Sequence, residues 1–319
     1  MNVVTTGDAV GSAVTGWGAA LPDHVLTNAD LERRLDTSDA WIVERTGIHE
    51  RRVGGSTVAL ATDAAGRALE RARLAPDDID LLMVSTNTPD QPVPASSARV
   101  QAALGLRCGV FDLNSGCSGF VYGLVAADGM VARGLRRVLV VASDTVSRIV
   151  DPQDRSTAIL FGDAAGAVVL EAVPGPSAVA GYDLGADGRL GDLIQQDHGG
   201  TVAMDGHEVF RRAVRATVGS AQRALDRASV TTDGVALFVP HQANLRIIDA
   251  VAGRLGIEPG RTMVVLDRTG NTSSASIPLA LAEAADAGRL HPGDLVLLSG
   301  FGAGMTWASA VLRWAPDPR

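Results

Sequence analysis

Cys117 lies at a corner between an expected strand and an expected helix, a position from which a thiol can act as a nucleophile. The apolar residues 110–113 predict the strand, and apolar residues at helical spacing over 120–131 predict a helix that begins directly after the corner. The first turn of a helix carries unpaired N–H groups and a partial positive charge, which favour a thiolate. Gly116 and Gly119 leave room for a substrate carbonyl beside the sulfur. The alternative interpretation is a buried structural cysteine.

His241 and Asn271 are the residues whose chemistry best complements such a thiol. A thiolate attacks a thioester carbonyl and holds the acyl group covalently. A protonated imidazole would lower the pKa of the sulfur, whereas a neutral imidazole would donate its Nε2–H to an oxyanion. With the Asn271 amide as a second donor, two neutral groups could stabilise an enolate. This combination fits decarboxylation of a malonyl thioester, followed by attack of the carbanion on the held acyl group.

Each of these residues also has an ordinary structural interpretation. A single histidine after a strand is often structural, and the segment that starts at Asn271 could merely cap a helix. The segment 301–304 (FGAG) is either a turn or a source of backbone N–H groups. In the second case the N–H of Ala303 and that of Cys117 would form an oxyanion hole. A Cys-His-Asn set also fits a papain-like protease, but the chain lacks the local signature of that family.

An internal repeat predicts how residues so far apart in the chain can meet. Residues 67–82 align without gaps with residues 223–238, and VFDLNSGCSG aligns with VVLDRTGNTSS at nearly the same offset. A repeat of this size indicates a duplicated fold. We therefore divide the chain into an N-terminal half, 11–172, that carries the nucleophile, and a C-terminal half, 173–319, that carries the histidine and the asparagine.

The alternation of strands and helices predicts an α/β fold with parallel sheets covered by helices. Joining two copies as a pseudo-dimer stacks two sheets with helices between them. In the alignment Asn271 occupies the corner of Cys117, and His241 occupies the position of Ser85, so the three side chains are expected at one seam. The expected strands are 12–18, 79–85, 110–113, 137–142, 164–170, 235–239, 263–266, 295–299 and 306–313, and the expected helices are 28–35, 38–45, 57–73, 96–104, 120–131, 208–228, 244–255 and 274–287.

Composition limits the classes of function. The chain has 319 residues, 46% of them hydrophobic and 20% charged, and its net charge of −8 argues against nucleic-acid binding. It contains no lysine, which excludes Schiff-base and P-loop chemistry. Two cysteines are too few for a disulfide framework, no apolar run is long enough to span a membrane, and the histidines show no zinc-site spacing. We expect a soluble cytoplasmic protein without a metal.

The sequence resembles the β-ketoacyl-acyl-carrier-protein synthase III family of the thiolase-like superfamily over essentially its whole length. The matching segments are SDAWIVERTGIHERR (38–52), DLNSGCSGFVYGL (112–124), DRSTAILFGDAAGA (154–167), PHQANLRII (240–248), GNTSSASIP (270–278) and FGAGMTW (301–307). The resemblance implies a five-layered αβαβα fold and a homodimer. It also implies that acyl-CoA, a substrate rather than a cofactor, acylates Cys117, and that malonyl-acyl carrier protein then condenses with loss of CO₂, with His241 and Asn271 acting in the decarboxylation.

The same resemblance implies the binding residues. Trp41 and Arg155 would sandwich the adenine of CoA, Arg45 would lie near its phosphates, and Phe301 would shield the nucleophile. Arginine suits such contacts because its plane stacks on rings and grips phosphates. The predicted carrier-protein docking residues are Gln242, Ala243, Asn244, Leu245, Arg246, Arg211 and Arg212. For Arg211 and Arg212 the alternative is a solvated helix face.

Two departures from the family pattern bear on specificity. Val93 stands where the family often has a phenylalanine that reaches across the dimer, which suggests room for branched or longer primers. The loop between Leu193 and Met204 is shorter than expected and predicts a more open pocket mouth. Two alternatives to condensation stay open: transfer of an acyl group to a hydroxyl or amine without decarboxylation, and a silent partner subunit, which the presence of Cys117 disfavours.

Overall fold

The computed structural model describes residues 10–314 of the chain. The last five residues of the predicted C-terminal half therefore lie outside the described residues. The predicted boundary after residue 172 falls near the end of strand β7 (Asp163–Pro174). A short connection then leads from β7 to the next strand, β8 (Val179–Ala186).

The N-terminal sheet has five strands in the order β1-β7-β6-β4-β5. Strand β4 runs parallel to β5 and β6, whereas β7 runs antiparallel to both β1 and β6. The prediction of purely parallel sheets is therefore wrong: β6 leads into β7 without a long crossover helix, so the chain returns in the opposite direction. The remaining strands of this sheet are β1 (Val10–Ala20), β4 (Leu81–Ser85), β5 (Gly109–Leu113) and β6 (Arg137–Thr145).

The C-terminal sheet repeats this topology with four strands in the order β11-β12-β13-β8. Its strands pair in the same senses: β11 is parallel to β12, and β13 is antiparallel to both β12 and β8. Strands β8, β13, β12 and β11 thus correspond to β1, β7, β6 and β4, as the internal repeat predicts. The three strands not yet bounded are β11 (Leu237–Pro240), β12 (Leu295–Gly302) and β13 (Thr306–Arg313).

The predicted strand at Met263–Leu266 is wrong, and the Gln242 side chain explains why. Its Nε2 donates to the carbonyls of Pro240 and Met263 at 2.8 and 3.1 Å, and its Oε1 accepts the N–H of Val265 at 2.8 Å. These bonds occupy backbone groups that a strand would use for a ladder. Only the bridge between Phe238 and Thr262 remains where the N-terminal half has β5.

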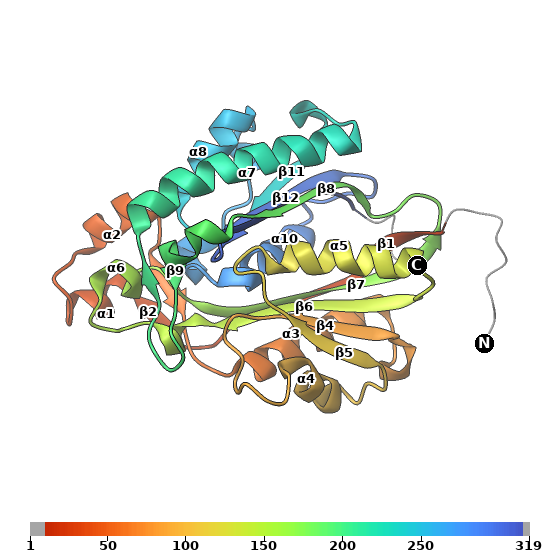
Figure 1. The fold of residues 1–319 in the computed structure, drawn as a ribbon, viewed down its shortest axis with the longest axis horizontal. Helices are drawn as coiled ribbons and strands as arrows, with labels where there is room; N and C mark the ends of the chain where they lie inside the picture. The colour runs from red at the N-terminus through yellow and green to blue at the C-terminus, as the bar shows by residue number, and fades with distance from the viewer. Residues whose placement is uncertain (1–9, 315–319) are drawn as a thin grey trace.

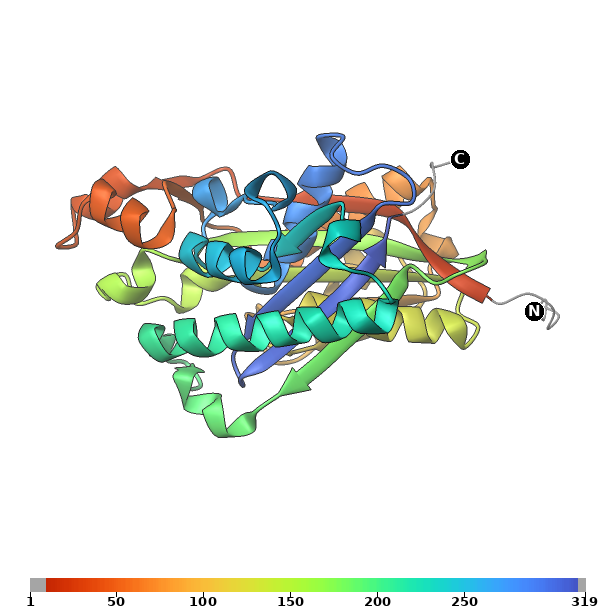
Figure 2. The ribbon, with the colours of Figure 1, turned by 90° about the horizontal axis from the view of Figure 1, so that it is seen from above.

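Six longer helices form three layers around and between the two sheets (Figure 1). One outer layer covers the N-terminal sheet, the middle layer separates the sheets, and the other outer layer covers the C-terminal sheet, where α7 runs obliquely across the strands (Figure 2). The layers are α3 (Thr57–Ala72) with α4 (Ser96–Leu104), then α5 (Gly119–Ala132) with α10 (Ser276–Asp286), then α7 (Gly206–Ala228) with α8 (Leu245–Leu255). The five-layered αβαβα prediction is confirmed.

The short elements gather mainly at the end of the molecule where α2 and β9 lie in Figure 1. The helices are α1 (Asn28–Glu32), α2 (Asp39–Thr46), α6 (Arg155–Ala158) and α9 (Leu266–Thr269), and the strands are β2 (Val25–Thr27), β3 (Glu50–Arg52), β9 (Ile194–Gln195) and β10 (Ala203–Met204). The 3₁₀ turns are Pro76–Asp78, Val146–Ile149, Gly188–Leu193, Thr232–Gly234, Pro259–Arg261 and Ser273–Ala275.

Sequence-local signals set the ends of the helices. Ser56 and Asp205 accept backbone N–H groups at the starts of α3 and α7, and Gly105 and Gly256 end α4 and α8 in the left-handed conformation. In the middle layer α5 is apolar over most of its circumference because it packs against both sheets, as a helix in the interior of a large fold must. The main core therefore spans the two halves.

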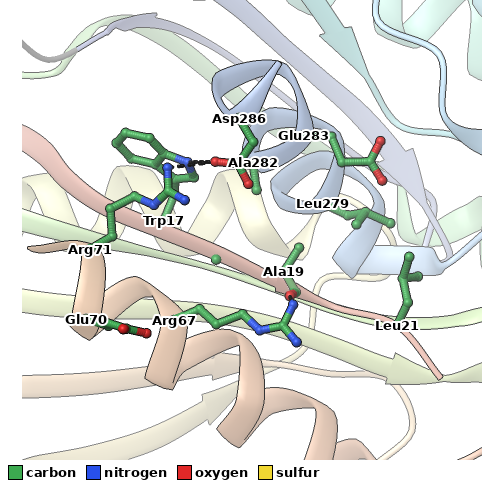
Figure 3. A pocket seen from close by; sticks show the side chains of 11 residues that line it. Trp17, Ala19, Leu21, Arg67, Glu70, Arg71, Leu279, Ala282, Glu283 and Asp286 are labelled. Atoms are coloured by element: carbon green, nitrogen blue, oxygen red, sulfur yellow. Dashed lines mark hydrogen bonds and ion pairs between the residues drawn. The ribbon is translucent and has the colours of Figure 1, made fainter. Parts of the chain in front are cut away.

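At the β1 edge of the N-terminal sheet, a charged and aromatic cluster joins β1, α3 and α10 beside a cavity of about 640 Å³ (Figure 3). The indole Nε1 of Trp17 donates to Asp286 at 2.9 Å, and Arg71 lies over the Trp17 ring, 4.4 Å from its centroid, while pairing with Asp286 at 2.7 Å. Trp314 packs on the same indole, with ring centroids 4.9 Å apart. Trp17 thus ties the outer helix layer to the middle one.

We expect Trp17→Ala to lower the free energy of unfolding by about 2 kcal/mol, because it removes a half-buried ring and three contacts. Trp17→Phe keeps a ring in place and loses the Nε1 donor, so it should cost about 1 kcal/mol. Denaturant unfolding measures both. A phenylalanine variant as unstable as the alanine variant would contradict the importance of ring packing.

Candidate active site

Cys117 occupies a strand–corner–helix unit, as the sequence predicts. Strand β5 ends at Leu113, and α5 begins at Gly119, two residues beyond the cysteine. The corner is held by hydrogen bonds: Asn114 Oδ1 accepts the N–H of Gly116 at 3.2 Å, and the Ser118 hydroxyl donates to Ser115 O at 2.7 Å. The sulfur therefore lies at the amino end of the buried helix.

The structure brings Cys117, His241 and Asn271 to one cavity of about 770 Å³. His241 follows β11 directly, and Asn271 is fixed by backbone bonds to the other half of the chain: its N–H donates to Leu160 O at 2.8 Å, and its carbonyl accepts the N–H of Gly162 at 3.0 Å. Each of the three residues thus depends on a strand end or loop at the seam between the two sheets.

A glycine of β12, Gly302, allows this close approach. Its neighbour Gly300 lies between the histidine and the cysteine corner: a Cβ there would be 3.5 Å from both His241 Cβ and Ser118 Cα, an ordinary contact distance, and 3.1 Å from the Ile277 side chain. A Cβ on Gly302 would lie 2.2 Å from the amide nitrogen of Cys117, a distance that no side chain tolerates. The segment predicted as a loop is therefore strand as far as Gly302, and Ala303 follows it at the cavity wall.

Burial sets the protonation of the two titratable residues. Burial lowers the pKa of His241 to about 3, so its imidazole is neutral at pH 7. Burial also raises the pKa of the Cys117 thiol to about 12, although the residue keeps partial contact with the cavity. The predicted thiolate is therefore wrong for the free protein, because loss of water around the sulfur outweighs the helix terminus. Of the two imidazole states considered from the sequence, the neutral one is present.

Four residues of the site were not predicted. Ser276 Oγ lies 2.7 Å from His241 Nδ1, and Ser273 Oγ lies 3.4 Å from Cys117 Sγ. Asn87 lines the cavity and donates to Ser273, and the buried Asp144 lies behind Asn87. The signal that could have indicated the two serines is the hydroxyl-rich run NTSSAS at 271–276.

Further out, the aromatic residues expected at the substrate channel are in place. Phe301 packs edge-on against the His241 ring, with centroids 5.4 Å apart. Arg45 and Arg155 both lie on the Trp41 ring, 4.6 and 4.7 Å from its centroid. Trp41 and Arg45 line the cavity, whereas Arg155 donates to the backbone of Asp36 instead. No aromatic ligand fits between Trp41 and Arg155 at this spacing, so a ligand would have to displace an arginine.

Of the two features expected to influence specificity, Val93 lies outside the cavity and the short loop lies in its wall. The side chain of Val93 is 83% exposed and does not line the cavity within this chain. The short loop forms the β9–β10 hairpin, whose residues Ile194 and Met204 do line it. The hairpin therefore belongs to the wall of the pocket.

The expected carrier-protein segment divides into buried and exposed parts. Gln242 is fully buried by the contacts that shape residues 263–265, and Ala243 is buried at the cavity wall, so neither lies on the outer surface as a docking residue must. Asn244 caps α8 and donates to Arg45 O at 2.9 Å. Leu245 packs against Gly47. Arg246 lies 5.8 Å from the Phe210 ring, at the mouth of the cavity.

Arg211 and Arg212, in the first turns of α7, are exposed and share one acidic partner. Arg211 pairs with Glu208 at 2.7 Å, and Arg212 lies 3.5 Å from the same carboxylate. The N-cap residue of α7, Asp205, adds a second carboxylate, so these four charges cancel at this end of the helix. The patch expected from the sequence is therefore neutralised at Arg211 and Arg212, and Arg246 lies 5.8 Å from the ring of Phe210, the residue before Arg211.

Five layers built from a duplicated α/β unit, with a cysteine before the buried helix of the first copy, define the thiolase-like class of enzymes. Two family models match: 3-oxoacyl-[acyl-carrier-protein] synthase III over residues 111–188, and its C-terminal model over residues 225–314. A β-ketoacyl-[acyl-carrier-protein] synthase III of Roseiflexus castenholzii is 50% identical over 324 residues, covering 95% of this chain and 98% of the relative.

Solved structures agree. The 3-oxoacyl-[acyl-carrier-protein] synthase III of Aquifex aeolicus VF5 matches with a TM-score of 0.94 and 42% identity, covering 95% of this chain and all of that one. The priming β-ketosynthase of the R1128 polyketide pathway matches with a TM-score of 0.94 and 35% identity over the full length of both chains. The chain belongs to the β-ketoacyl-acyl-carrier-protein synthase III family.

Residues 10–314 contain neither a candidate membrane span nor a candidate metal-binding cluster. None of the helices there combines the length and the apolar character of a membrane span. The same part of the chain has no cluster of three or more histidine, cysteine, aspartate or glutamate side chains placed to hold a metal ion.

The raised pKa of Cys117 predicts the pH dependence of its reaction with iodoacetamide. Only the thiolate reacts, and below a pKa of about 12 its fraction rises about tenfold per pH unit. The alkylation rate of the free protein should therefore climb with this slope from pH 6 to pH 9. Peptide mass spectrometry separates Cys117 from the other free cysteine, Cys108. A plateau near pH 7 would show a thiolate already formed at neutral pH.

Proposed function

We propose that this protein catalyses the condensation that initiates fatty-acid synthesis, joining an acyl group from acyl-CoA to malonyl-acyl carrier protein with loss of CO₂. The observation that carries the proposal is the meeting of Cys117, His241 and Asn271 around one cavity in a chain of this family. Acyl-CoA is a substrate here, and the proposed chemistry needs no cofactor. The enzyme would act in the cytoplasm, where both substrates are found.

In the first half-reaction the Cys117 sulfur attacks the thioester carbonyl of acyl-CoA. A bond forms between this sulfur and the acyl carbon, the bond from that carbon to the CoA sulfur breaks, and the thiol proton leaves with CoA as its free thiol. The backbone N–H groups of Cys117 and Ala303 are proposed to hold the carbonyl oxygen while it carries negative charge. The approach of Gly302 to the Cys117 amide places this strand end where such a hole requires it.

In the second half-reaction the malonyl group loses CO₂, and the electron pair of the broken C–C bond moves onto the thioester oxygen as an enolate. The enolate carbon then attacks the acyl carbon, the bond to Cys117 breaks, and the sulfur regains a proton from solvent. His241 and Asn271 are the proposed donors to the enolate oxygen. Ser276 Oγ accepts the N–H of Gln242 at 3.3 Å and lies 2.7 Å from His241 Nδ1. We propose that the serine hydroxyl donates to Nδ1, so that the proton of the neutral ring is on Nε2.

Binding of the two substrates is proposed at the cavity mouth. Trp41 would stack on the adenine once Arg155 or Arg45 has moved off its ring, and Arg45 would approach the phosphates. Arg246, with the ion-paired Arg211 and Arg212 beside it, would meet an acidic carrier protein. These surface residues replace the buried Gln242 and Ala243 in that role.

The division of labour predicts opposite effects for two substitutions. Cys117→Ala should abolish the acyl-enzyme, because no other residue of the cavity offers a thiol. Asn271→Ala should leave acylation within about threefold of wild type and slow condensation about a hundredfold, as loss of one donor to an oxyanion does. Intact-protein mass spectrometry follows acylation, and release of labelled CO₂ with the 3-ketoacyl product follows condensation.

The same assay distinguishes the alternatives. Equal loss of both half-reactions in Asn271→Ala would contradict the separate roles. Acylation of the wild-type protein without release of CO₂ would favour an acyltransferase that never decarboxylates. A panel of acyl-CoA primers decides between a general fatty-acid starter and the starter of a polyketide, the role named for one of the similar structures.

We further propose a homodimer that forms along the free edge of the N-terminal sheet. Among the described residues β5 pairs only with β4, so its other edge leaves backbone groups unpaired. The edge carries the half-buried apolar side chains of Val110, Phe111 and Leu113, and Val93 is among the most exposed large apolar residues. A second copy on this edge would cover them and bring Val93 to the partner.

Light scattering should then give a mass of twice 32.9 kDa for the wild-type protein. Val93→Glu should shift the equilibrium toward the monomer, because it places a charge in the proposed interface without altering the core. Tyr182→Glu is the matched control, since Tyr182 is a large exposed side chain on β8, far from β5 in the strand order. A Val93→Glu protein that stays dimeric would contradict this interface.

A further inference from the structure

Ser273 is the hydroxyl residue nearest the nucleophile, and the backbone around it is unusual. Its Oγ lies 3.4 Å from Cys117 Sγ, within the range of a hydrogen bond to sulfur. Its φ angle is 54°, in the left-handed region that residues other than glycine rarely adopt. The N–H of Ser273 donates to Asn271 Oδ1 at 2.9 Å, which fixes this loop conformation. Such strain at a cavity wall persists only where the surroundings hold it.

Asn87 determines which way the Ser273 hydroxyl points. Its Nδ2 donates one hydrogen to Ser273 Oγ at 3.0 Å and the other to Asp144 Oδ2 at 3.2 Å. Ser273 Oγ is therefore an acceptor toward Asn87. Its own hydrogen is therefore available for donation to the Cys117 sulfur.

Asp144 in turn fixes the amide of Asn87. The carboxylate is fully buried and accepts six hydrogen bonds, all from neutral groups. One of them is the backbone N–H of Asn87, at 2.7 Å, and two come from Ser274, in the same loop as Ser273. A carboxylate accepts only, so the Asn87 nitrogen must face it. The directions of the hydrogen bonds from Asn87 to Asp144 and to Ser273 are thereby set, and the Ser273 hydrogen is free for the sulfur.

We propose that Ser273 is a further catalytic residue of the acylation step, whose hydroxyl donates a hydrogen bond to the Cys117 sulfur as the thiol loses its proton, with Asn87 and Asp144 as positioning residues. The proposal deepens the function proposed above and rests on it. The Ser273 hydrogen bond lowers the pKa of the Cys117 thiol against the larger effect of burial and against the charge of Asp144. Donation to a thiolate is stronger than donation to a thiol because the acceptor is charged.

The other charged and titratable groups of the cavity are few. His241 is neutral at pH 7, and His207, Arg45 and Arg246 line the outer part of the same cavity. Among the described residues, Ser273 is the side chain that lies within hydrogen-bond distance of the sulfur. While the sulfur is acylated it carries no charge, so the hydroxyl has no such role in the loss of CO₂; it acts again only when the bond to the acyl carbon breaks and the sulfur leaves as a thiolate.

The test separates the two half-reactions and includes a measurement that needs no substrate. Ser273→Ala and Ser273→Gly both remove the hydroxyl, and glycine also accepts the left-handed φ without strain. We expect each to slow acylation by acyl-CoA about tenfold, and to lower the iodoacetamide rate of Cys117 about tenfold at every pH from 6 to 9 with the slope unchanged. Release of CO₂ when malonyl-acyl carrier protein is added to the isolated acyl-enzyme should stay within twofold, because the acylated sulfur carries no charge in that step. Asn87→Ala, which frees the Ser273 hydroxyl to rotate, should lower the alkylation rate about threefold.

Thr272→Val is the matched control. Thr272 is the neighbouring residue of the loop, and its Oγ1 is buried without a hydrogen-bond partner among the described residues. The Thr272→Val protein should show the acylation and alkylation rates of the wild type. Equal slowing in Thr272→Val would show a general disturbance of the loop and would overturn the proposal. So would wild-type rates in both Ser273 variants, or faster alkylation, which would mean that Ser273 accepts from the thiol. Alkylation reports on Ser273 even if the wild-type protein forms no acyl-enzyme, a result that would count against the proposed function alone.

Discussion

Removal of water at the seam between the two sheets is the constraint on which the site depends. It keeps the Cys117 thiol protonated and the His241 imidazole neutral, so the cavity holds polar donors without formal charge around the reacting atoms. Neutral donors stabilise the negative charge that develops on the enolate oxygen. A charged group in the same place would instead bind the carboxylate of the malonyl group as a counter-ion. The cost is a weak nucleophile at rest, which explains why the sulfur needs a hydrogen-bond donor of its own as it loses the proton.

The fold produces this seam through close approach of backbone. Two sheets packed on a shared helical layer place the start of α5 opposite the ends of β11 and β12. A side chain at Gly302 would collide with the amide of Cys117, so glycine is required where β12 passes the cysteine corner. The proposed oxyanion site therefore depends on this strand.

The sequence was sufficient to predict the layers, most helices and strands, and the meeting of the cysteine, histidine and asparagine. Hydrophobic periodicity and the internal repeat can both be seen in the sequence itself. It was insufficient wherever a side chain replaced a regular backbone pattern. Gln242 holds residues 263–265 out of the sheet, a contact that no spacing reveals. Asn87, Asp144 and Ser273 come from three separate segments, so their network exists only in three dimensions. The thiolate prediction was wrong because the helix terminus is visible in sequence and desolvation is not.

The duplication also explains how one loop can serve two half-reactions. In the N-terminal copy the corner carries the nucleophile, and in the C-terminal copy the corresponding corner carries Asn271, with Ser273 two residues later. The N–H of Ser273 holds Asn271 Oδ1, which turns the amide nitrogen of Asn271 away from Ser273, while the hydroxyl of Ser273 faces the sulfur. The left-handed conformation at Ser273 is what lets a single turn present both groups. Because acylation uses one and decarboxylation the other, the loop can remain in a single conformation through the whole reaction.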